Sequence, residues 1–182
     1  MPALAPTVTD ERDALLTFLD QQREAILAAP FGLTEAQARS APSPSALSLA
    51  GLIRHVATGE RGWIVGVLSQ RFADLPELPE DDPQCFQVPA EETVASLSAA
   101  YRLVAAETED IVRALPSLDV EVPLPDAPWF PPGAKVSARW ILLHLIEETA
   151  RHAGHADIVR EAIDGANAFE LLDRYEAAVA PA

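Results

Sequence analysis

Four long segments of the chain carry apolar side chains at intervals of three and four residues, and proline-rich stretches separate them. The segments cover residues 9–29, 48–71, 91–115 and 137–164. This interval matches the turn of an α-helix, so each segment is expected to bury one face against the others. A shorter pattern over residues 168–179 predicts a last helix. The sequence therefore predicts an all-α fold, a four-helix bundle with long loops and a short C-terminal helix, in a single domain spanning residues 1–182.

The sequence also contains signals for the ends and the buried faces of these helices. Residues 9–11, Thr-Asp-Glu, form an N-cap with acids in the first turn, and Gly165 follows the fourth segment as a residue that ends a helix. In the first segment, Phe18 and Leu19 are expected on the buried side and the arginines on the other. The second segment contains four glycines, each of which weakens a helix by about 1 kcal/mol. Close packing of this helix is expected to compensate.

The charge of the chain excludes two classes of partner. Asp and Glu number 28 against 13 Lys and Arg, which gives a formal net charge of −15. Binding to nucleic acid or to an anionic membrane surface depends on clustered basic side chains, so neither is expected. The single cysteine, Cys85, excludes an internal disulfide, and its acidic surroundings argue against a reactive thiol. No signal peptide or membrane span is recognisable, and a cytoplasmic location is expected.

The fourth segment places polar side chains on its core-facing stripe. The stripe advances by three or four residues at each step, through Ile141, His144, Glu148, His152, His155 and Val159. Buried polar groups of this kind are costly when they lack a partner. His144 and His152 lie about 12 Å apart along the helix axis, at 1.5 Å per residue, so they cannot bind the same ion. An i,i+4 pair such as Glu148 and His152 can.

A third ligand must come from another helix, and His55 is the only histidine outside the fourth segment. It lies at the edge of the apolar face of the second segment, from which it can point into the bundle. Three protein ligands leave coordination positions for water or substrate, which is typical of catalytic metal sites. Spacing alone leaves a second interpretation open, in which Glu148 and His152 form a buried hydrogen-bonded pair and His55 is an ordinary core residue.

Residues 139–158, 52–57, 33–37 and 42–46 resemble segments of the DinB/YfiT-like superfamily, and the resemblance covers nearly the whole chain. Residues 139–158, RWILLHLIEETARHAGHADI, look like its last bundle helix. Residues 52–57, LIRHVA, look like its second helix. Residues 33–37 and 42–46, LTEAQ and PSPSA, resemble its lead-in segment.

The resemblance implies a four-helix bundle that holds a divalent metal with one residue of the second helix and two of the last. Carried over to this chain, the ligands are His55, Glu148 and His152. Many members have histidine at the position of Glu148, so this chain is more similar to the branch that contains mycothiol-dependent maleylpyruvate isomerase. His155 departs from the usual pattern and is the second choice as a ligand. His144 is expected in the core or beside the ligands.

The resemblance also implies an activity, which is the transfer or use of a low-molecular-weight bacterial thiol of the mycothiol or bacillithiol type on a small electrophile. Zinc is the first expectation for the metal, with nickel, iron and manganese as alternatives. A different class of function stays open, namely a non-catalytic metal- or ligand-binding bundle related to stress, and a metal hydrolase is a weaker option. A homodimer is also left open.

Structural or surface roles are expected for five other side chains. Trp63, Trp129 and Trp140 are expected in the core or in a pocket wall. Arg151 and Arg160 can hold a substrate carboxylate, but ion pairs with Glu147 or Asp157 at the surface are favoured.

Overall fold

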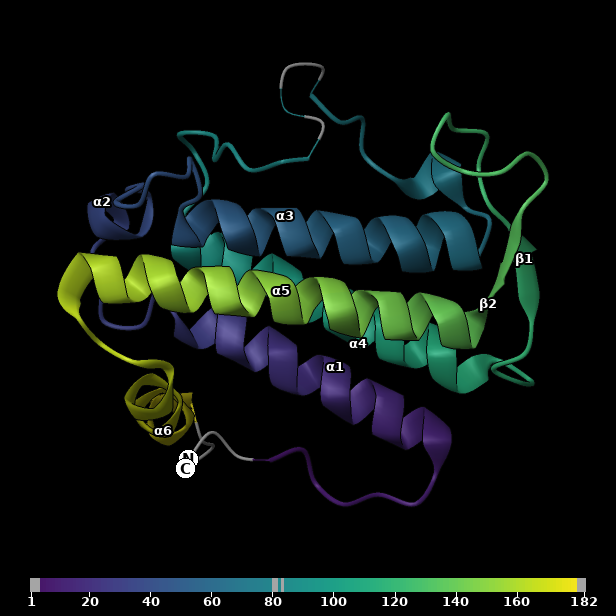
Figure 1. Ribbon diagram of the computed structural model, residues 1–182, viewed down its shortest axis with the longest axis horizontal. Coiled ribbons are helices and arrows are strands. Elements are labelled where there is room, and N and C mark those ends of the chain that lie inside the picture. The colour runs from purple at the N-terminus through teal and green to yellow at the C-terminus, as the bar shows by residue number, and fades with distance from the viewer. Residues whose placement is uncertain (1–3, 80–81, 83, 180–182) are drawn as a thin grey trace.

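The computed structural model describes residues 4–79, 82 and 84–179. Its four long helices lie side by side as a bundle (Figure 1). They are α1 (Glu11–Ala28), α3 (Leu49–Arg61), α4 (Val94–Ala114) and α5 (Ala138–Asp164). Helix α1 packs on α4 and α5, and α3 packs on the same two helices from the other side. The all-α bundle predicted from the sequence is therefore confirmed, and α6 (Ala168–Val179) is the predicted last helix.

Three of the long helices begin within two residues of the predicted position, and α4 begins three residues after it. Side-chain oxygens of Asp10, Ser48, Thr93 and Ser137 each accept a hydrogen bond from a backbone N–H in the first turn of their helix. These bonds satisfy donors that have no partner inside a helix. At the other end of α5, Gly165 has a φ of 76°, a left-handed conformation that glycine adopts without strain.

Several short elements were not expected from the sequence. A short helix α2 (Glu35–Ala38) precedes α3, and the 3-10 turn η2 (Phe72–Asp74) follows it. Strands β1 (Glu121–Pro123) and β2 (Lys135–Ser137) pair antiparallel between α4 and α5. Elements of three or four residues are too short for a hydrophobic period to develop, so the sequence pattern does not reveal them.

The second predicted helix changes its winding near its end. After α3, the chain continues as the π-helical segment η1 (Gly62–Leu68). Of the four glycines in this region, Gly51 and Gly66 are packed closely against other parts of the chain. A Cβ atom on Gly59 or Gly62 would meet no heavy atom of the described residues within 4 Å, outside the local helix. Close approach of neighbouring chain therefore accounts for glycine at positions 51 and 66 but not at positions 59 and 62.

The interior of the bundle holds an ion pair among its apolar side chains. Arg23 of α1 and Glu60 of α3 are 4% and 1% exposed, and two nitrogens of the guanidinium donate to the two carboxylate oxygens at 3.0 and 2.6 Å. The hydroxyl of Thr108 on α4 donates to the same carboxylate at 2.6 Å. Burial alone would lower the pKa of Arg23, but the charge and hydrogen bonds of Glu60 raise it above its usual value.

Two expectations about individual side chains are wrong. Phe18 is 50% exposed, whereas Arg23 takes a place in the interior of the bundle. Arg160 is not paired with Asp157 at the surface: it is 3% exposed, binds Asp164 and donates to the backbone oxygens of Ala29 and Phe31. Sequence periodicity treats arginine as a surface residue and therefore misses both buried guanidinium groups.

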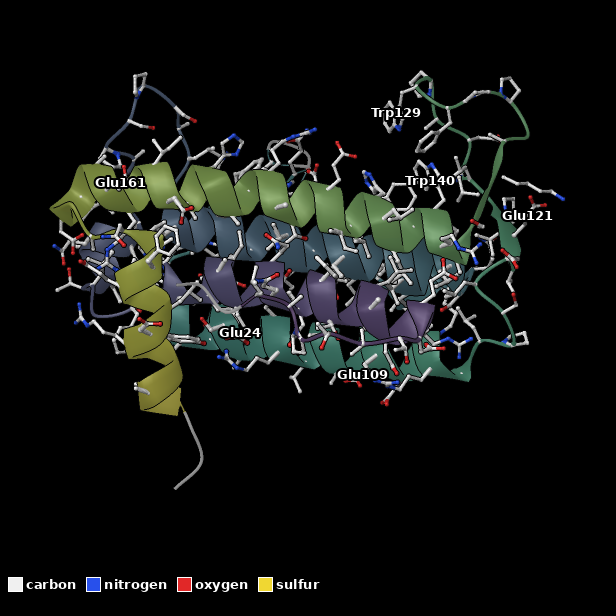
Figure 2. All side chains as sticks on the ribbon, turned by 60° about the horizontal axis from the view of Figure 1, so that its bottom comes forward. Glu24, Glu109, Glu121, Trp129, Trp140 and Glu161 are labelled. Carbon is white, nitrogen blue, oxygen red and sulfur yellow. The ribbon has the colours of Figure 1, made fainter. Side chains whose placement is uncertain are left out.

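Figure 2 shows Trp129 and Trp140 at the end of the bundle where β1 and β2 connect α4 to α5. Within the described residues, no helix is long and apolar enough to cross a membrane.

Candidate metal centre

The three residues predicted as metal ligands lie together between α3 and α5, which run side by side in Figure 1. Oε1 of Glu148 is 3.2 Å from Nε2 of His152 and 3.6 Å from Nε2 of His55. The three ligand atoms all lie within 4.8 Å of one another. Donor atoms around a tetrahedral ion with bonds of about 2.1 Å are about 3.4 Å apart, so this arrangement can hold one metal ion after small adjustments.

The ring of His55 is oriented by the loop that follows η2. Its Nδ1–H donates to the backbone oxygen of Gln84 at 2.6 Å. Phe86 stacks on the same ring, with centroids 4.0 Å apart and planes inclined by 16°. When Nδ1 carries the proton, the lone pair of Nε2 points toward Glu148 and is free to bind a metal.

Asp82 holds this loop in shape. Its two carboxylate oxygens accept the backbone N–H groups of Phe86 and Gln87 at 3.0 and 2.8 Å. Arg54, the neighbour of His55 on α3, binds the same carboxylate at 3.2 Å and the backbone oxygen of Gln87 at 2.7 Å. The loop is thus attached to the helix that carries His55, which fixes the position of the Gln84 oxygen.

The environment of the other two residues favours the protonation states that a metal requires. Partial burial acts to raise the pKa of Glu148, but the nearby imidazoles of His152 and His55 outweigh it and lower this pKa. Burial and the neighbouring His55 lower the pKa of His152, although Glu148 opposes this. At neutral pH the carboxylate is therefore charged and the imidazole of His152 neutral.

The remaining histidines of the α5 stripe lie outside the group. Nδ1 of His155 is 3.3 Å from Nδ1 of His152, on the opposite side of that ring from Glu148. His155 is therefore placed to form a hydrogen bond with His152 rather than to coordinate the same metal ion. His144 packs against two indoles that also contact each other, with ring centroids 4.7 Å from Trp63 and 5.3 Å from Trp140.

A cavity of about 550 Å³ opens beside the three converging residues, which form part of its wall. Its lining is mainly apolar and includes Trp63, Phe72, Phe86, Trp129 and Phe130. The expectation that tryptophans wall a pocket is confirmed for Trp63 and Trp129. Gly59 and Gly62, which were not expected at the site, also line the cavity. Their spacing from His55, at four and seven residues on one helix face, is the signal that places them there.

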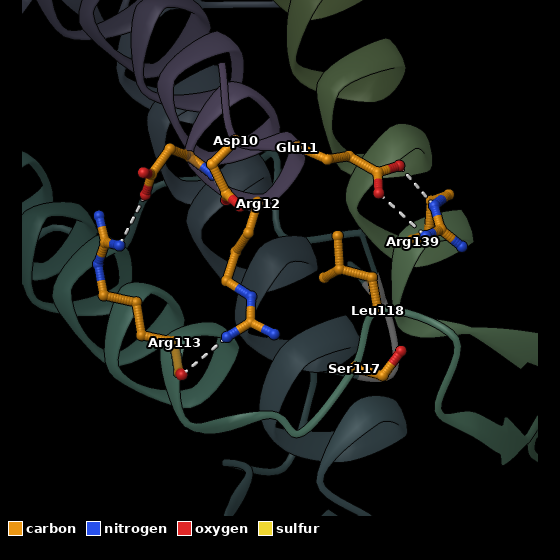
Figure 3. A pocket seen from close by; sticks show the side chains of 8 residues that line it. Asp10, Glu11, Arg12, Arg113, Ser117, Leu118 and Arg139 are labelled. Atoms are coloured by element: carbon orange, nitrogen blue, oxygen red, sulfur yellow. Dashed lines mark hydrogen bonds and ion pairs between the residues drawn. The ribbon is translucent and has the colours of Figure 1, made fainter. Parts of the chain in front are cut away.

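A second cavity of about 540 Å³ lies where the first turn of α1, the end of α4 and the start of α5 meet (Figure 3). Three arginines line it, and each is already bound. Arg139 pairs with Glu11 and Asp119, and Arg113 pairs with Asp13 and Glu109. Arg12 donates to the backbone oxygens of Arg113 and Leu115, which satisfies carbonyls at the end of α4. These contacts stabilise the ends of the helices. Because the arginines of this second cavity are already paired, the group formed by His55, Glu148 and His152 is the candidate functional site.

Comparison with known proteins places the chain in a family. A search of curated proteins finds no match. Among solved structures, the chain is similar to a conserved protein from Enterococcus faecalis, with a TM-score of 0.65 and 22% identity over 87% of this chain and 100% of that one. At this identity the likeness concerns the fold. The resemblance to the DinB/YfiT-like superfamily is confirmed. Residues 14–165 match the family profile described as mycothiol S-transferase, and the chain therefore belongs to this family.

Proposed function

We propose that the protein binds one divalent metal through His55, Glu148 and His152 and transfers a thiol of the mycothiol type to an electrophile held in the adjacent cavity. The observation that carries this proposal is the convergence of three ligand atoms within 4.8 Å at the wall of an apolar cavity. Zinc is the first candidate, because imidazole and carboxylate ligands with open positions suit it, and nickel, iron and manganese are alternatives.

The residues of the chain prepare the site for a thiol. Gln84 holds the proton of His55 on Nδ1, and His155 is within hydrogen-bond distance of Nδ1 of His152. Both imidazoles can therefore offer Nε2 toward Glu148. A bound divalent ion supplies Lewis acidity, which lowers the pKa of a thiol so that the thiolate is present near neutral pH.

The group transfer requires no further cofactor. The thiol gives up its proton to solvent, its sulfur forms a bond to an electrophilic carbon, and the leaving group departs with the bonding electrons. When the electrophile is an activated alkene, no group leaves and the adjacent carbon takes up one proton instead. Among the described residues that line the cavity, Glu148 is the only carboxylate, and as a ligand it does not serve as a general base.

Replacing Asp82 with alanine is expected to weaken zinc binding by about tenfold, because partners that orient metal ligands contribute about 10–100-fold to affinity. The change removes both acceptors of the loop that positions the Gln84 oxygen. Competition with a chromophoric chelator measures the affinity. Asp173→Ala, at an exposed position of α6, is the matched control. Equal affinity in the two variants would contradict a positioning role for Asp82.

The proposed function is tested in two steps. Elemental analysis of untagged wild-type protein should find about one divalent ion per chain. Conjugation of monochlorobimane with candidate thiols then separates an enzyme from a binding protein. Metal without turnover of any thiol would favour the alternative of a non-catalytic metal-binding bundle. Equal metal content in wild type and a His55→Ala/His152→Ala variant would reject the site itself.

A further inference from the structure

The cavity beside the proposed metal centre has an unusual distribution of charge for a protein with a net charge of −15. Among the described residues that line it, Glu148 is the only one with a formal charge. Two nearby arginines are already bound. Arg61 binds Glu107 and the backbone oxygen of Asp74, and Arg151 binds Glu147 as well as Glu148. An anionic ligand in the body of the cavity would find no free guanidinium.

The rim of the cavity is apolar and exposed. Trp129, Leu78 and Phe72 line the cavity and remain 75%, 47% and 44% exposed. They come from separate segments, so the sequence pattern of a single helix does not account for them. Trp63 and Phe130 lie edge to face, with centroids 6.3 Å apart, and Trp129 packs on Phe130. A flat apolar ligand would cover these surfaces and gain the transfer free energy of their burial.

Two glycines that no close packing requires, Gly59 and Gly62, line the cavity. His55, Gly59 and Gly62 share one face of α3 and the start of η1 and all line the cavity. A Cβ atom at Gly59 or Gly62 would enter open space with respect to the rest of the described chain. Glycine in a helix costs stability relative to alanine, and no left-handed φ requires it at either position. Their effect is to leave a smooth backbone surface directly beside His55.

From these observations we propose that the cavity binds an uncharged, flat aromatic electrophile, with its ring over Gly59 and Gly62 and its reactive carbon toward the converging histidines. The inference rests on the proposed function and adds its substrate class. During the thiol transfer this electrophile either loses its leaving group with the bonding electrons or, when it is an activated alkene, gains one proton. A dicarboxylate such as maleylpyruvate is disfavoured, because its second charge would be removed from water without a partner.

Binding of non-reactive probes tests the cavity separately from catalysis. The uncharged fluorophore prodan is displaced from purified protein by 2-naphthamide or by 2-naphthoate, two ligands of one shape that differ in charge. On protein treated with a chelator to remove any metal, we expect the amide to bind at least about tenfold more tightly, because without the ion the carboxylate loses hydration and gains no counter-charge. Equal or tighter binding of the naphthoate would overturn the proposal.

The role of these glycines is tested with Gly59→Leu, and Gly154→Leu is the matched control. Gly154 is an exposed helical glycine of α5 whose Cβ would also meet open space, but it does not line the cavity. Gly59→Leu is expected to weaken 2-naphthamide at least about tenfold, and the control is expected to bind as wild type. Gly59→Ala, which improves helix propensity, provides a folded second variant with a smaller loss. Unchanged affinity in Gly59→Leu and Gly59→Ala would overturn the proposal.

The experiments distinguish a failure of the transferase proposal from a failure of the proposed substrate class. If the probes behave as expected but no thiol is ever conjugated, the cavity assignment stands and the transferase proposal fails. If monochlorobimane is conjugated while naphthoate and naphthamide bind equally, the transferase proposal stands and the preference of the cavity for uncharged ligands is wrong.

Discussion

Replacing Arg23 with methionine is expected to lower the free energy of unfolding by about 3–5 kcal/mol, which is the typical cost of removing one partner of a buried ion pair. Glu60, 1% exposed, would keep the hydrogen bond from the hydroxyl of Thr108 but would lose the positive charge that pairs with it. The carboxylate must then remain charged without a counter-charge or become protonated, and both states are unfavourable in the fold. Urea unfolding followed by circular dichroism measures the change.

Two further variants identify the cause of this loss. Arg71→Met removes an arginine from an exposed pair with Asp74, in which both side chains are nearly half exposed, and should change stability by less than about 1 kcal/mol. The double variant Arg23→Met/Glu60→Met removes both buried charges and is expected to recover most of the stability. A double variant as unstable as the sum of the two single ones would mean that shape, rather than charge, governs this part of the core.

Replacing His152 with alanine is expected to weaken zinc binding by more than about a hundredfold, because even the partners of metal ligands contribute about 10–100-fold. The variant keeps only two of the three converging donors, and thiol conjugation should fall to the uncatalysed rate. Metal per chain, measured by mass spectrometry after dialysis, and the kcat/KM for monochlorobimane check the two effects separately.

Other histidines of α5 provide graded controls for metal content. His155→Ala removes a neighbour of the His152 ring and is expected to lower the affinity for the metal by about tenfold. His144→Ala removes packing against Trp63 and Trp140 and should leave metal content unchanged. Loss of the metal in His155→Ala as complete as in His152→Ala would show that His155 is itself a ligand.

The fold was largely predictable because its long helices repeat an apolar face many times. The predicted segment 137–164 differs from α5 by one residue, and residues 168–179 coincide with α6. The winding of η1 was not predictable, since the apolar pattern of a seven-residue segment does not distinguish the i→i+5 hydrogen bonds of a π-helix from those of an α-helix. The buried position of Arg23 was also missed, because it depends on Glu60, which lies 37 residues away in the sequence.

The convergence of His55, Glu148 and His152 was predictable from the sequence, but the residues that surround them were not. The i,i+4 spacing of Glu148 and His152 is local and can be read from the sequence, whereas the approach of His55 depends on how α3 packs on α5. The Gln84 oxygen could not be predicted, since every residue carries a backbone carbonyl and only the loop geometry selects one of them. The role of the three residues as metal ligands is a proposal that the metal measurements test.

That backbone contact has a consequence for how related sequences are compared. Gln84 contributes a peptide oxygen to His55, so this contact does not depend on the identity of its side chain. Asp82 contributes its carboxylate to the peptide groups that shape the loop, so its chemistry is constrained. A relative that has lost Gln84 but retains an acceptor at position 82 is therefore expected to keep the same histidine geometry. Divergence in this loop is a poor guide to loss of the site.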